Sequence, residues 1–240
     1  MMRSEIAKAY SVLLDQNKVS DNNEWQSINI DKKNPLVEVT DLFLDLGSTT
    51  RIKEETNADL PWSEDHFQER ICGEPINPGK QYKNWPYYKG IDNDNLFRDS
   101  GKFSHNYMER YWCKGFKGIR FNYGDLNDII ERLKNNTYTR QAFLSVWHPE
   151  DQSNEGVRVP CTIGYWFYRN GNKLDCTYLI RSCDAVRHFR NDIYMTYRLL
   201  EHVGINIGLL PGNLKMWIGS FHCFQSDLYT LKKYVRDTIN

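Results

Sequence analysis

Apolar residues recur along this chain at two different spacings, which predict two kinds of element. Spacings of three and four, which place side chains on one face of a helix, occur over residues 5–16, 124–136 and 186–200. An alternating placement of apolar residues, which suits a strand, occurs over residues 35–46 and 213–222. Helical and strand periods follow one another in a single chain, so the pattern predicts an α/β fold.

Two further strand-like runs, CTIGYWFYRN and GNKLDCTYLIRS, meet at Asn170-Gly171, a dipeptide typical of two-residue hairpin turns. With Asn170 and Gly171 as the turn, Cys161 lies opposite Ile180 at the open end of the hairpin, beside Arg181. The pairs expected from this register are Phe167 with Leu174, Tyr165 with Cys176, Ile163 with Tyr178 and Cys161 with Ile180.

A further helix is predicted over PWSEDHFQER, with Ser63 as its N-cap. Leu60, Glu64, Phe67 and Ile71 fall on one face of this helix, at spacings of four, three and four. One carboxylate therefore shares an otherwise apolar face, which makes Glu64 a candidate functional group and argues weakly against the alternative of an ordinary surface acid.

Composition limits the class of partner. Lys and Arg number 31, as do Asp and Glu, so no bulk positive charge favours a nucleic acid. No stretch approaches the roughly 20 apolar residues of a membrane span, and the start MMRSEIAKAYSVLLDQNK lacks the apolar run of a signal peptide. We expect one soluble, cytoplasmic domain over residues 1–240, with a long aromatic loop region over 75–115 as a binding surface or a structural connection.

The six cysteines are scattered without a C-x-x-C pair, so we expect reduced thiols rather than a disulfide scaffold or a zinc ribbon. Cys161 differs from the others because it follows Pro160 at a strand entrance and lies near Arg181 across the hairpin. A nearby cation lowers the pKa of a thiol and favours the nucleophilic thiolate. Cys161 is therefore a candidate nucleophile, with a buried structural thiol as the alternative.

Polar residues near the open end of the hairpin are further candidates. Arg181 and Ser182 carry donors suited to phosphate oxygens, although Arg181 could equally form an ordinary ion pair with Asp184. His222 ends the alternating strand and is either a ligand-binding residue or a core histidine. Asp192 borders the apolar stripe of the helix after the hairpin, which argues weakly against a purely solvated acid.

These residues and their surroundings resemble the thymidylate synthase family. RVPCTIGYWFYRNGNKLDCTYLIRSCDAVRHFRNDIYMTYRLL is similar to the family's Pro-Cys nucleophile, hairpin, Arg-Ser-x-Asp segment and following helix. YTRQAFLSVWHPED resembles its arginine-bearing strand and Trp-x-Pro-x-Asp segment, and IGSFHCF resembles its Gly-x-x-His-x-Tyr strand. The match covers about residues 101–230 and implies a mainly antiparallel or mixed sheet flanked by helices, with homodimers paired through the sheet.

The resemblance implies a role for each matching residue, and it implies no metal. Cys161 would add to C6 of a pyrimidine nucleoside monophosphate, making C5 reactive toward the one-carbon unit of 5,10-methylenetetrahydrofolate. Arg181 and Ser182 would hold the 5'-phosphate, together with Arg140 from the other subunit. The remaining roles fall on Asp184 for the pterin, His222 for the sugar hydroxyl, Tyr107 for the pyrimidine and its waters, and Glu64, with Glu69 as the fallback, for proton handling.

One departure concerns the base. Asp192 stands where thymidylate synthases have an asparagine, whose amide donates to O4 and accepts from N3–H of uracil. An ionised carboxylate cannot donate, but it accepts from the N4 amino group of cytosine. The FRND segment and the Gly-Ser-x-His of IGSFH resemble the phage deoxycytidylate hydroxymethylase branch. The sequence therefore predicts a nucleotide C5 hydroxymethyltransferase that acts on dCMP or CMP.

A second departure concerns water. The 18 residues that follow His222 do not match the apolar tail that closes over folate in thymidylate synthases. A less sealed site admits water to the methylene-bearing intermediate, which favours a hydroxymethyl product over a methyl product.

Other departures leave the substrate open. Gln141 replaces the second arginine of the family's pair, and Ile180 replaces the glutamine before Arg-Ser. Thr162 replaces the histidine after the nucleophile, and Phe224 replaces the tyrosine beside the sugar. The choice between ribose and deoxyribose therefore stays open. Three alternatives remain: a thymidylate synthase or dUMP hydroxymethylase, if Asp192 is protonated or displaced; a non-catalytic nucleotide- or RNA-binding relative; and a cysteine hydrolase that uses Cys161 and His222.

Overall fold

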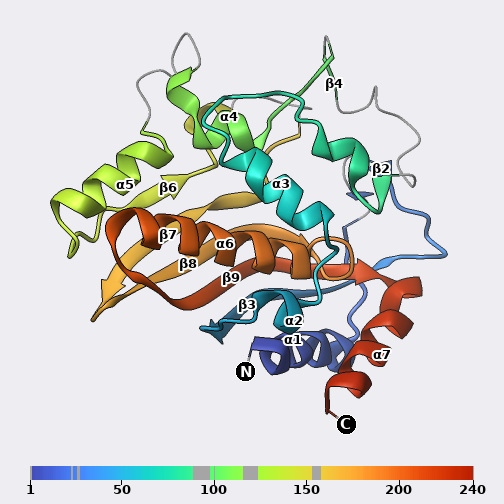
Figure 1. Cartoon of the computed structure of the whole chain (residues 1–240). Coiled ribbons are helices and arrows are strands. Elements are labelled where there is room, and N and C mark those ends of the chain that lie inside the picture. The colour runs from blue at the N-terminus through green and yellow to red at the C-terminus, as the bar shows by residue number, and fades with distance from the viewer. Residues whose placement is uncertain are drawn as a thin grey trace.

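The computed structural model describes residues 2–22, 24–25, 28–88, 98–99, 101–115, 124–152 and 158–239. Within them, the centre of the fold is a five-stranded mixed sheet in the order β3-β9-β8-β7-β6 (Figure 1). The strands are β3 (Leu36–Gly47), β6 (Phe143–Ser145), β7 (Thr162–Asn170), β8 (Lys173–Asp184) and β9 (Leu210–Phe224). β8 and β9 run parallel and the other neighbours run antiparallel, which confirms the predicted α/β fold with a mainly antiparallel sheet.

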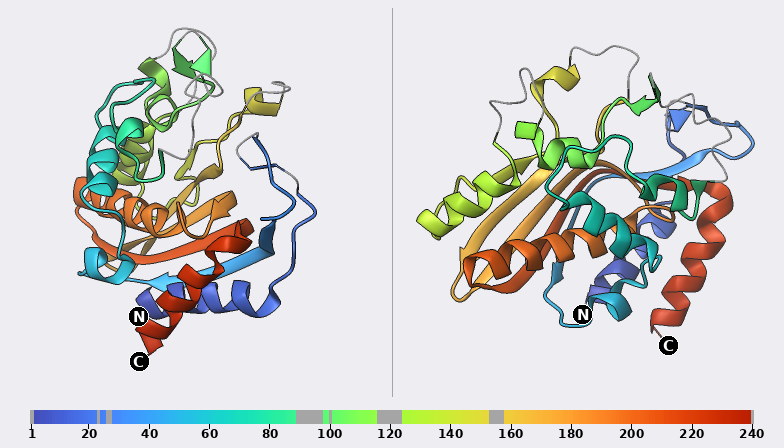
Figure 2. Two further views of the ribbon diagram at one scale, coloured as in Figure 1. Left: turned by 90° about the vertical axis from the view of Figure 1, so that its right-hand side faces the viewer. Right: turned by 45° about the horizontal axis from the view of Figure 1, so that its top comes forward.

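Helices cover one face of this sheet. They are α1 (Met2–Gln16), α2 (Ile52–Thr56), α3 (Trp62–Arg70), α4 (Tyr107–Tyr111), α5 (Leu126–Asn135), α6 (Phe189–Ile207) and α7 (Leu228–Ile239). The long helix α6 packs on β8 and β9, α3 packs on α6, and α1 packs between β3 and α7. The first view of Figure 2 shows α3 and α6 on the same side of the sheet. Buried apolar side chains from these layers form one continuous core.

Short elements lie around this framework. Two small hairpins are formed by β1 (Glu24–Trp25) with β2 (Ile28–Asn29) and by β4 (Arg98–Asp99) with β5 (Lys102–Phe103). Single 3-10 turns are η1 (Gln81–Asn84), η4 (Cys113–Gly115), η6 (Pro149–Gln152) and η7 (Gln225–Asp227). The described part of the region 75–115 thus consists mostly of short elements and loops, as predicted, whereas residues 89–97 and 100 lie outside the described residues.

The opposite face of the sheet carries a stripe of large apolar side chains that are only partly buried. Trp166 pairs with Phe143 on one side, and Trp217 pairs with both Leu179 and Phe43 on the other, so these residues point to the same face. The stripe consists of Phe43, Phe143, Trp166, Tyr168, Leu179 and Trp217. We call this set the outer face.

The predicted hairpin exists, but its predicted register is wrong. The turn residues are Gly171 and Asn172, since Asn170 already pairs with Lys173. Gly171 has a φ of 62°, which suits a two-residue turn with glycine in its first position. Phe167 therefore faces Cys176 and Tyr165 faces Tyr178, two residues from the expected pairs. An irregularity between Thr162 and Gly164 partly restores the register, so the peptide N–H of Arg181 donates to the carbonyl of Cys161 at 2.9 Å.

The remaining predicted elements are found with small shifts at their ends. α1, α5, β3 and β9 cover the segments expected for them, and Asp125 caps α5 through a capping box. α6 begins at Phe189 and ends at Ile207, and Gly208, with a φ of 72°, caps its C-terminus. The N-cap predicted at Ser63 is wrong: α3 begins at Trp62 after Pro61, and the Ser63 hydroxyl donates to Asn191 Oδ1 at 2.9 Å.

All six cysteines lie in described residues and carry thiols rather than disulfides. Among the described helices, none combines the length and apolar character that a bilayer crossing requires.

Candidate active site

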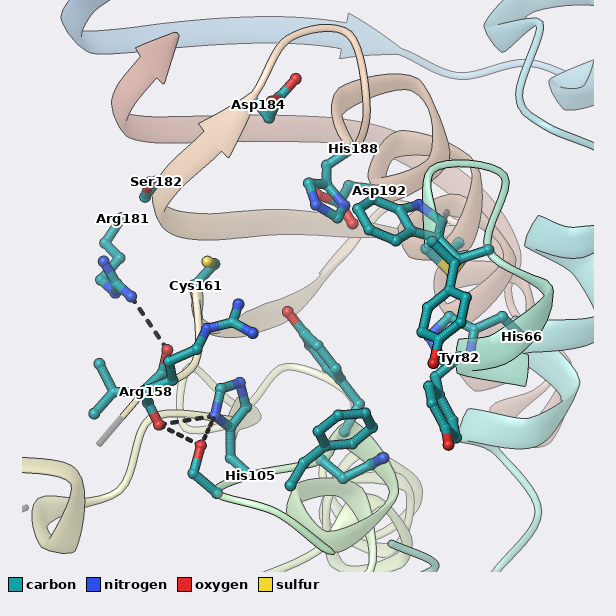
Figure 3. Close-up of a pocket in the computed structure, with 18 of the residues that line it drawn as sticks. His66, Tyr82, His105, Arg158, Cys161, Arg181, Ser182, Asp184, His188 and Asp192 are labelled. Atoms are coloured by element: carbon teal, nitrogen blue, oxygen red, sulfur yellow. Dashed lines mark hydrogen bonds between the residues drawn. The ribbon is translucent and has the colours of Figure 1, made fainter. Parts of the chain in front are cut away.

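A cavity of about 510 Å³ lies where β7 begins and where β8 and β9 end. Most of the residues predicted from the sequence line this one cavity: Tyr107, Cys161, Arg181, Ser182, Asp184, Asp192 and His222. Figure 3 shows how the labelled residues among them converge on it. The opposite wall comes from α3 and from the region between α3 and α4. Residues far apart in the sequence thus meet around a space of ligand size.

Cys161 is held at the cavity by the arginine that the sequence placed beside it. Arg181 donates from Nε to the carbonyl of Pro160 at 3.0 Å and from Nη2 to the carbonyl of Val159 at 3.1 Å. The guanidinium therefore fixes the two residues that precede the thiol. Burial raises the pKa of the Cys161 thiol above its ordinary value, while the nearby positive charge of Arg181 opposes that rise.

Asp192 occupies the first turn of α6 and is 8% exposed. Burial raises the pKa of its carboxyl to about 7, and the positive charge of Arg70 limits the rise. The Cys183 thiol makes a weak contact with its Oδ2 at 3.9 Å. The group can therefore change protonation state near neutral pH, and its hydrogen-bonding capacity toward a ligand changes with it.

Asp184 and His222 lie at the same end of the sheet and already have protein partners. The Asp184 carboxylate accepts from the peptide N–H groups of Val186 and Arg187, at 2.9 and 2.8 Å, and from the Arg187 guanidinium at 3.1 Å. His222 Nδ1 lies 3.2 Å from Ser220 Oγ. Burial lowers the pKa of His222, so its imidazole is neutral at pH 7.

Tyr107 belongs to a chain of buried hydroxyl groups behind the nucleophile. Its hydroxyl lies 2.8 Å from Thr162 Oγ1, which in turn lies 2.8 Å from the hydroxyl of Tyr178. The Arg70 guanidinium stacks 3.9 Å above the Tyr107 ring. Burial raises the pKa of Tyr107, so the phenol stays protonated at neutral pH.

Glu64 does not share this site, contrary to the expectation from the sequence. Its carboxylate accepts from Tyr194 at 2.7 Å and from Arg198 Nε at 3.0 Å, on the side of α3 that packs on α6. Partial burial raises its pKa, but the hydrogen bonds from Arg198, Tyr194 and Gln68 outweigh burial and lower it to about 2. The fallback Glu69 also lies outside the cavity lining, since it binds the peptide N–H groups of residues 80 and 81.

The face of α3 that lines the cavity is Trp62, His66 and Arg70, spaced by four residues. Sequence reasoning missed this face because it followed the apolar residues, although the spacing of four was visible in the sequence. Burial lowers the pKa of His66 to about 4, so the imidazole is neutral, and its ring stacks on Trp62 with centroids 5.2 Å apart. Arg158, which precedes Cys161 by three residues, is a second missed cation at the cavity.

Arg140 lies outside the cavity of its own chain. Its side chain is exposed, and its carbonyl accepts from Trp166 Nε1 at 3.2 Å, next to the outer face.

The cavity also has an aromatic region formed by Trp62, Tyr82, Trp85, Tyr88 and Phe103. Trp85 stacks on His188 with ring centroids 4.9 Å apart. Its buried Nε1 has no hydrogen-bond partner among the described residues. A flat heteroaromatic ligand with an acceptor atom fits such a region, because it supplies both a stacking surface and the missing acceptor.

One cavity at the end of a mixed sheet contains a thiol at a strand entrance, an arginine and a serine at the end of the neighbouring strand, and a buried carboxyl from α6. The sequence model of the family described as thymidylate synthase matches residues 75–239, more than half of the chain. The chain therefore belongs to the thymidylate synthase family, whose members are transferases of one-carbon groups.

Individual relatives are more distant. A protein of Methanococcoides burtonii provisionally named thymidylate synthase is 31% identical over 108 residues, which are 45% of this chain and 49% of the relative. The thymidylate synthase of Listeria monocytogenes is 31% identical over 114 residues, covering 47% and 36%. A provisionally named thymidylate synthase of Methanothermobacter thermautotrophicus is 28% identical over 149 residues, covering 57% and 66%. The chain thus spans about half, or less, of the first two relatives.

Proposed function

We propose that this protein is a hydroxymethyltransferase that converts a cytosine mononucleotide, dCMP or CMP, into its 5-hydroxymethyl derivative with 5,10-methylenetetrahydrofolate and water. Membership of the thymidylate synthase family supports the general chemistry of one-carbon transfer to a pyrimidine nucleotide. The observation that carries the choice of base is Asp192, a buried carboxyl in the cavity that contains Cys161.

Asp192 favours cytosine for a hydrogen-bonding reason. An ionised carboxylate only accepts, so it pairs with the N4 amino group of cytosine and is repelled by O4 of uracil. A protonated carboxyl can donate to O4 and accept from N3–H, and it therefore tolerates uracil as well. With a pKa of about 7, Asp192 discriminates against uracil most strongly above neutral pH.

The remaining residues divide the other tasks. Cys161, as thiolate, would add to C6, which makes C5 nucleophilic toward the one-carbon unit. C5 would then lose its proton, and the bond between the transferred carbon and the folate nitrogen would break with its electron pair leaving on nitrogen. Water would add to the resulting methylene carbon as the thiolate leaves C6. Arg181 and Ser182 bind the phosphate, because both donate at the same end of β8. His222 binds the sugar, and Tyr107 orders groups near the base.

Methylenetetrahydrofolate, when bound, supplies the one-carbon unit. The aromatic region that contains Trp62 and Trp85 would hold its ring system, and the unpartnered Trp85 Nε1 would donate to it. Asp184 is the residue that the family resemblance assigns to the pterin. Its carboxylate also accepts a hydrogen bond from Arg187, so the pterin would bind to the remaining lone pairs of the carboxylate oxygens.

The proposed enzyme acts as a homodimer paired through the outer face, and Arg140 completes the phosphate site of the partner. An uncovered stripe of large apolar residues on a sheet favours a second copy. Arg140 is exposed beside that face. Arg181 lies two residues after Leu179 in β8, so it is on the same face of the sheet. A phosphate at Arg181 would thus lie near the surface that a partner covers.

A second candidate is a thymidylate synthase or a dUMP hydroxymethylase. The names of the relatives favour it, and so does a carboxyl that is partly protonated near pH 7, because a protonated Asp192 can pair with uracil.

A product assay separates the two candidates. The purified protein is incubated with methylenetetrahydrofolate and, separately, with dCMP, CMP and dUMP, and the mass of each nucleotide is measured. We expect a hydroxymethyl adduct on a cytosine nucleotide. A methyl adduct on dUMP alone would establish the second candidate, and release of C5-bound tritium distinguishes either enzyme from a non-catalytic binder.

A further inference from the structure

Arg158 lies in the segment just before Cys161, and hydrogen bonds to its main chain hold it in place. Its carbonyl accepts from Ser104 Oγ at 2.8 Å and lies 3.1 Å from His105 Nδ1. Because a carbonyl only accepts, the His105 nitrogen is the donor in that contact. One side of the segment is thus tied to the chain that leads into α4.

The other side of the same segment is tied to β8. The Arg181 guanidinium binds the carbonyls of Val159 and Pro160, the two residues between Arg158 and Cys161. With the backbone fixed from both sides, the Arg158 side chain points into the cavity on the side where Cys161 lies (Figure 3). The backbone from which the Arg158 side chain extends is therefore fixed relative to Cys161.

Among the residues that the structure describes, two cations and one acid act on the ionisation of the thiol. Arg181 comes from β8 and Arg158 from the thiol's own segment, and both favour the thiolate, whereas Asp192 from α6 disfavours it when ionised. Tyr107 from α4 and Cys183 from β8 also interact with the thiol, and burial keeps both of them protonated at neutral pH. Burial of the sulfur is the largest cost of ionising it, so each nearby positive charge matters.

Arg181 cannot serve the thiolate alone during the proposed reaction. Two of its nitrogens already bind carbonyl oxygens, and its remaining capacity is the part that would meet a phosphate. A bound phosphate carries negative charge, which offsets the stabilisation that Arg181 gives to a neighbouring thiolate. A second cation that stays with the sulfur would keep the nucleophile ionised in the complex.

We propose that Arg158 is this second cation: a positioning residue that stabilises the thiolate of Cys161 while Arg181 binds the phosphate. The proposal rests on the role of Cys161 in the proposed function, and it goes beyond the family resemblance, which assigns no role to Arg158. The ionisation itself is simple, because the S–H bond gives its proton to water and leaves the electron pair on sulfur.

The test measures the ionisation of Cys161 without any nucleotide. The full-length protein and its Arg158→Gln, Arg158→Met and Arg158→Lys variants are alkylated with iodoacetamide from about pH 6 to about pH 10, and the rate at the Cys161 peptide is followed by mass spectrometry. Arg51→Gln is the control, since Arg51 is exposed and lies outside the cavity lining. A thermal melt checks that each variant is folded, and the Met variant keeps the aliphatic stem if the Gln variant does not fold.

We expect the midpoint of the pH profile to rise by about one pH unit in the Gln and Met variants, which is about tenfold less thiolate at neutral pH. The Lys variant should stay close to the parent because it keeps the charge, and the Arg51 variant should match the parent. Inorganic phosphate at constant ionic strength should raise the midpoint more in the Gln variant than in the parent.

Unchanged midpoints in the Gln and Met variants would overturn the proposal, and so would an equal rise in the Lys variant, which would point to packing instead of charge. Equal phosphate effects in the parent and the Gln variant would overturn the division of roles between the two arginines. Failure of the product assay with cytosine nucleotides would refute the proposed function but would leave this measurement unaffected, so the two failures are distinguishable.

Discussion

The two walls of the cavity are built in different ways. The sheet wall carries Cys161, Arg181 and Asp184 at the ends of strands, where hydrogen bonds between β7, β8 and β9 fix their positions. The opposite wall, from α3 to α4, carries mostly aromatic side chains and depends on individual side-chain contacts. Under the proposed function, the nucleophile and the phosphate-binding arginine therefore belong to the wall that sheet hydrogen bonds fix, whereas the opposite wall mainly offers stacking surfaces.

The sheet wall should be the more sensitive one to loss of a reacting group. We expect Cys161→Ser to lower kcat for the nucleotide product by at least about 1,000-fold, because a hydroxyl is a far weaker nucleophile than a thiolate. The measurement is product mass against time, with nucleotide binding as a check on folding. Cys72→Ser is the matched control, because Cys72 is exposed and lies outside the cavity lining. Equal activity of the two variants would remove Cys161 from the mechanism.

On the side of the opposite wall, a buried ion pair of α4 should contribute strongly to the free energy of unfolding. Arg110 of α4 pairs with Asp151 at 2.8 Å, and both side chains are almost fully buried. Arg110→Met leaves an unpaired buried carboxylate, so we expect the free energy of unfolding to fall by about 3 to 5 kcal/mol. Denaturant unfolding measures it.

The control for that prediction is an exposed pair. Lys134 and Glu131 are 2.8 Å apart with exposed side chains, so Lys134→Met should change the free energy of unfolding by less than about 1 kcal/mol. Similar losses in the two variants would contradict the contrast between buried and exposed pairs.

The pH dependence should separate the base-reading carboxyl from the rest of the site. The pKa of Asp192 is raised to about 7, so the ionised form that rejects uracil is lost as the pH falls through 7. We expect the ratio of kcat/KM for dCMP to that for dUMP to rise about tenfold from about pH 6 to about pH 8. Asp192→Asn does not titrate, so its ratio should stay flat; a ratio that changes equally in both proteins would assign the effect to another group.

The smallest effect is expected at Glu64, the acid on α3 that points away from the cavity. Because its carboxylate binds Arg198 and Tyr194 instead of lining the cavity, Glu64→Gln should change kcat/KM by less than about threefold. Steady-state kinetics with the preferred nucleotide measures it. A loss of about 100-fold or more would return Glu64 to a direct role in proton handling.

The sheet wall could be predicted from the sequence because its determinants are local. The alternation over β9 and the periodic stripe of α6 predict both elements, and the motif around Cys161 and Arg181 places a thiol and a guanidinium at the same end of the hairpin. Only the hairpin register failed, since the pattern does not tell whether glycine takes the first or the second turn position. The irregularity at Thr162 compensated for that error at the site itself.

The opposite wall could not be predicted because its determinants are tertiary. Leu60 was counted on the apolar face of α3, but the helix begins two residues later and Leu60 is 41% exposed. Whether Glu64 or His66 faces the cavity depends on how α3 packs on α6, where Arg198 and Tyr194 capture the carboxylate. Such pairings join residues about 130 positions apart, and no local spacing encodes them.

The central claim is that the carboxylate of Asp192 selects cytosine over uracil. It is tested most directly by measuring kcat/KM for dCMP, CMP and dUMP with the parent protein and with Asp192→Asn at about pH 8, where the parent carboxyl is ionised. The account predicts that the parent prefers a cytosine nucleotide and that the substitution shifts the preference toward dUMP by about 100-fold, because the amide can both donate to O4 and accept from N3–H. A parent that already prefers dUMP, or a variant with unchanged preference, would contradict the claim.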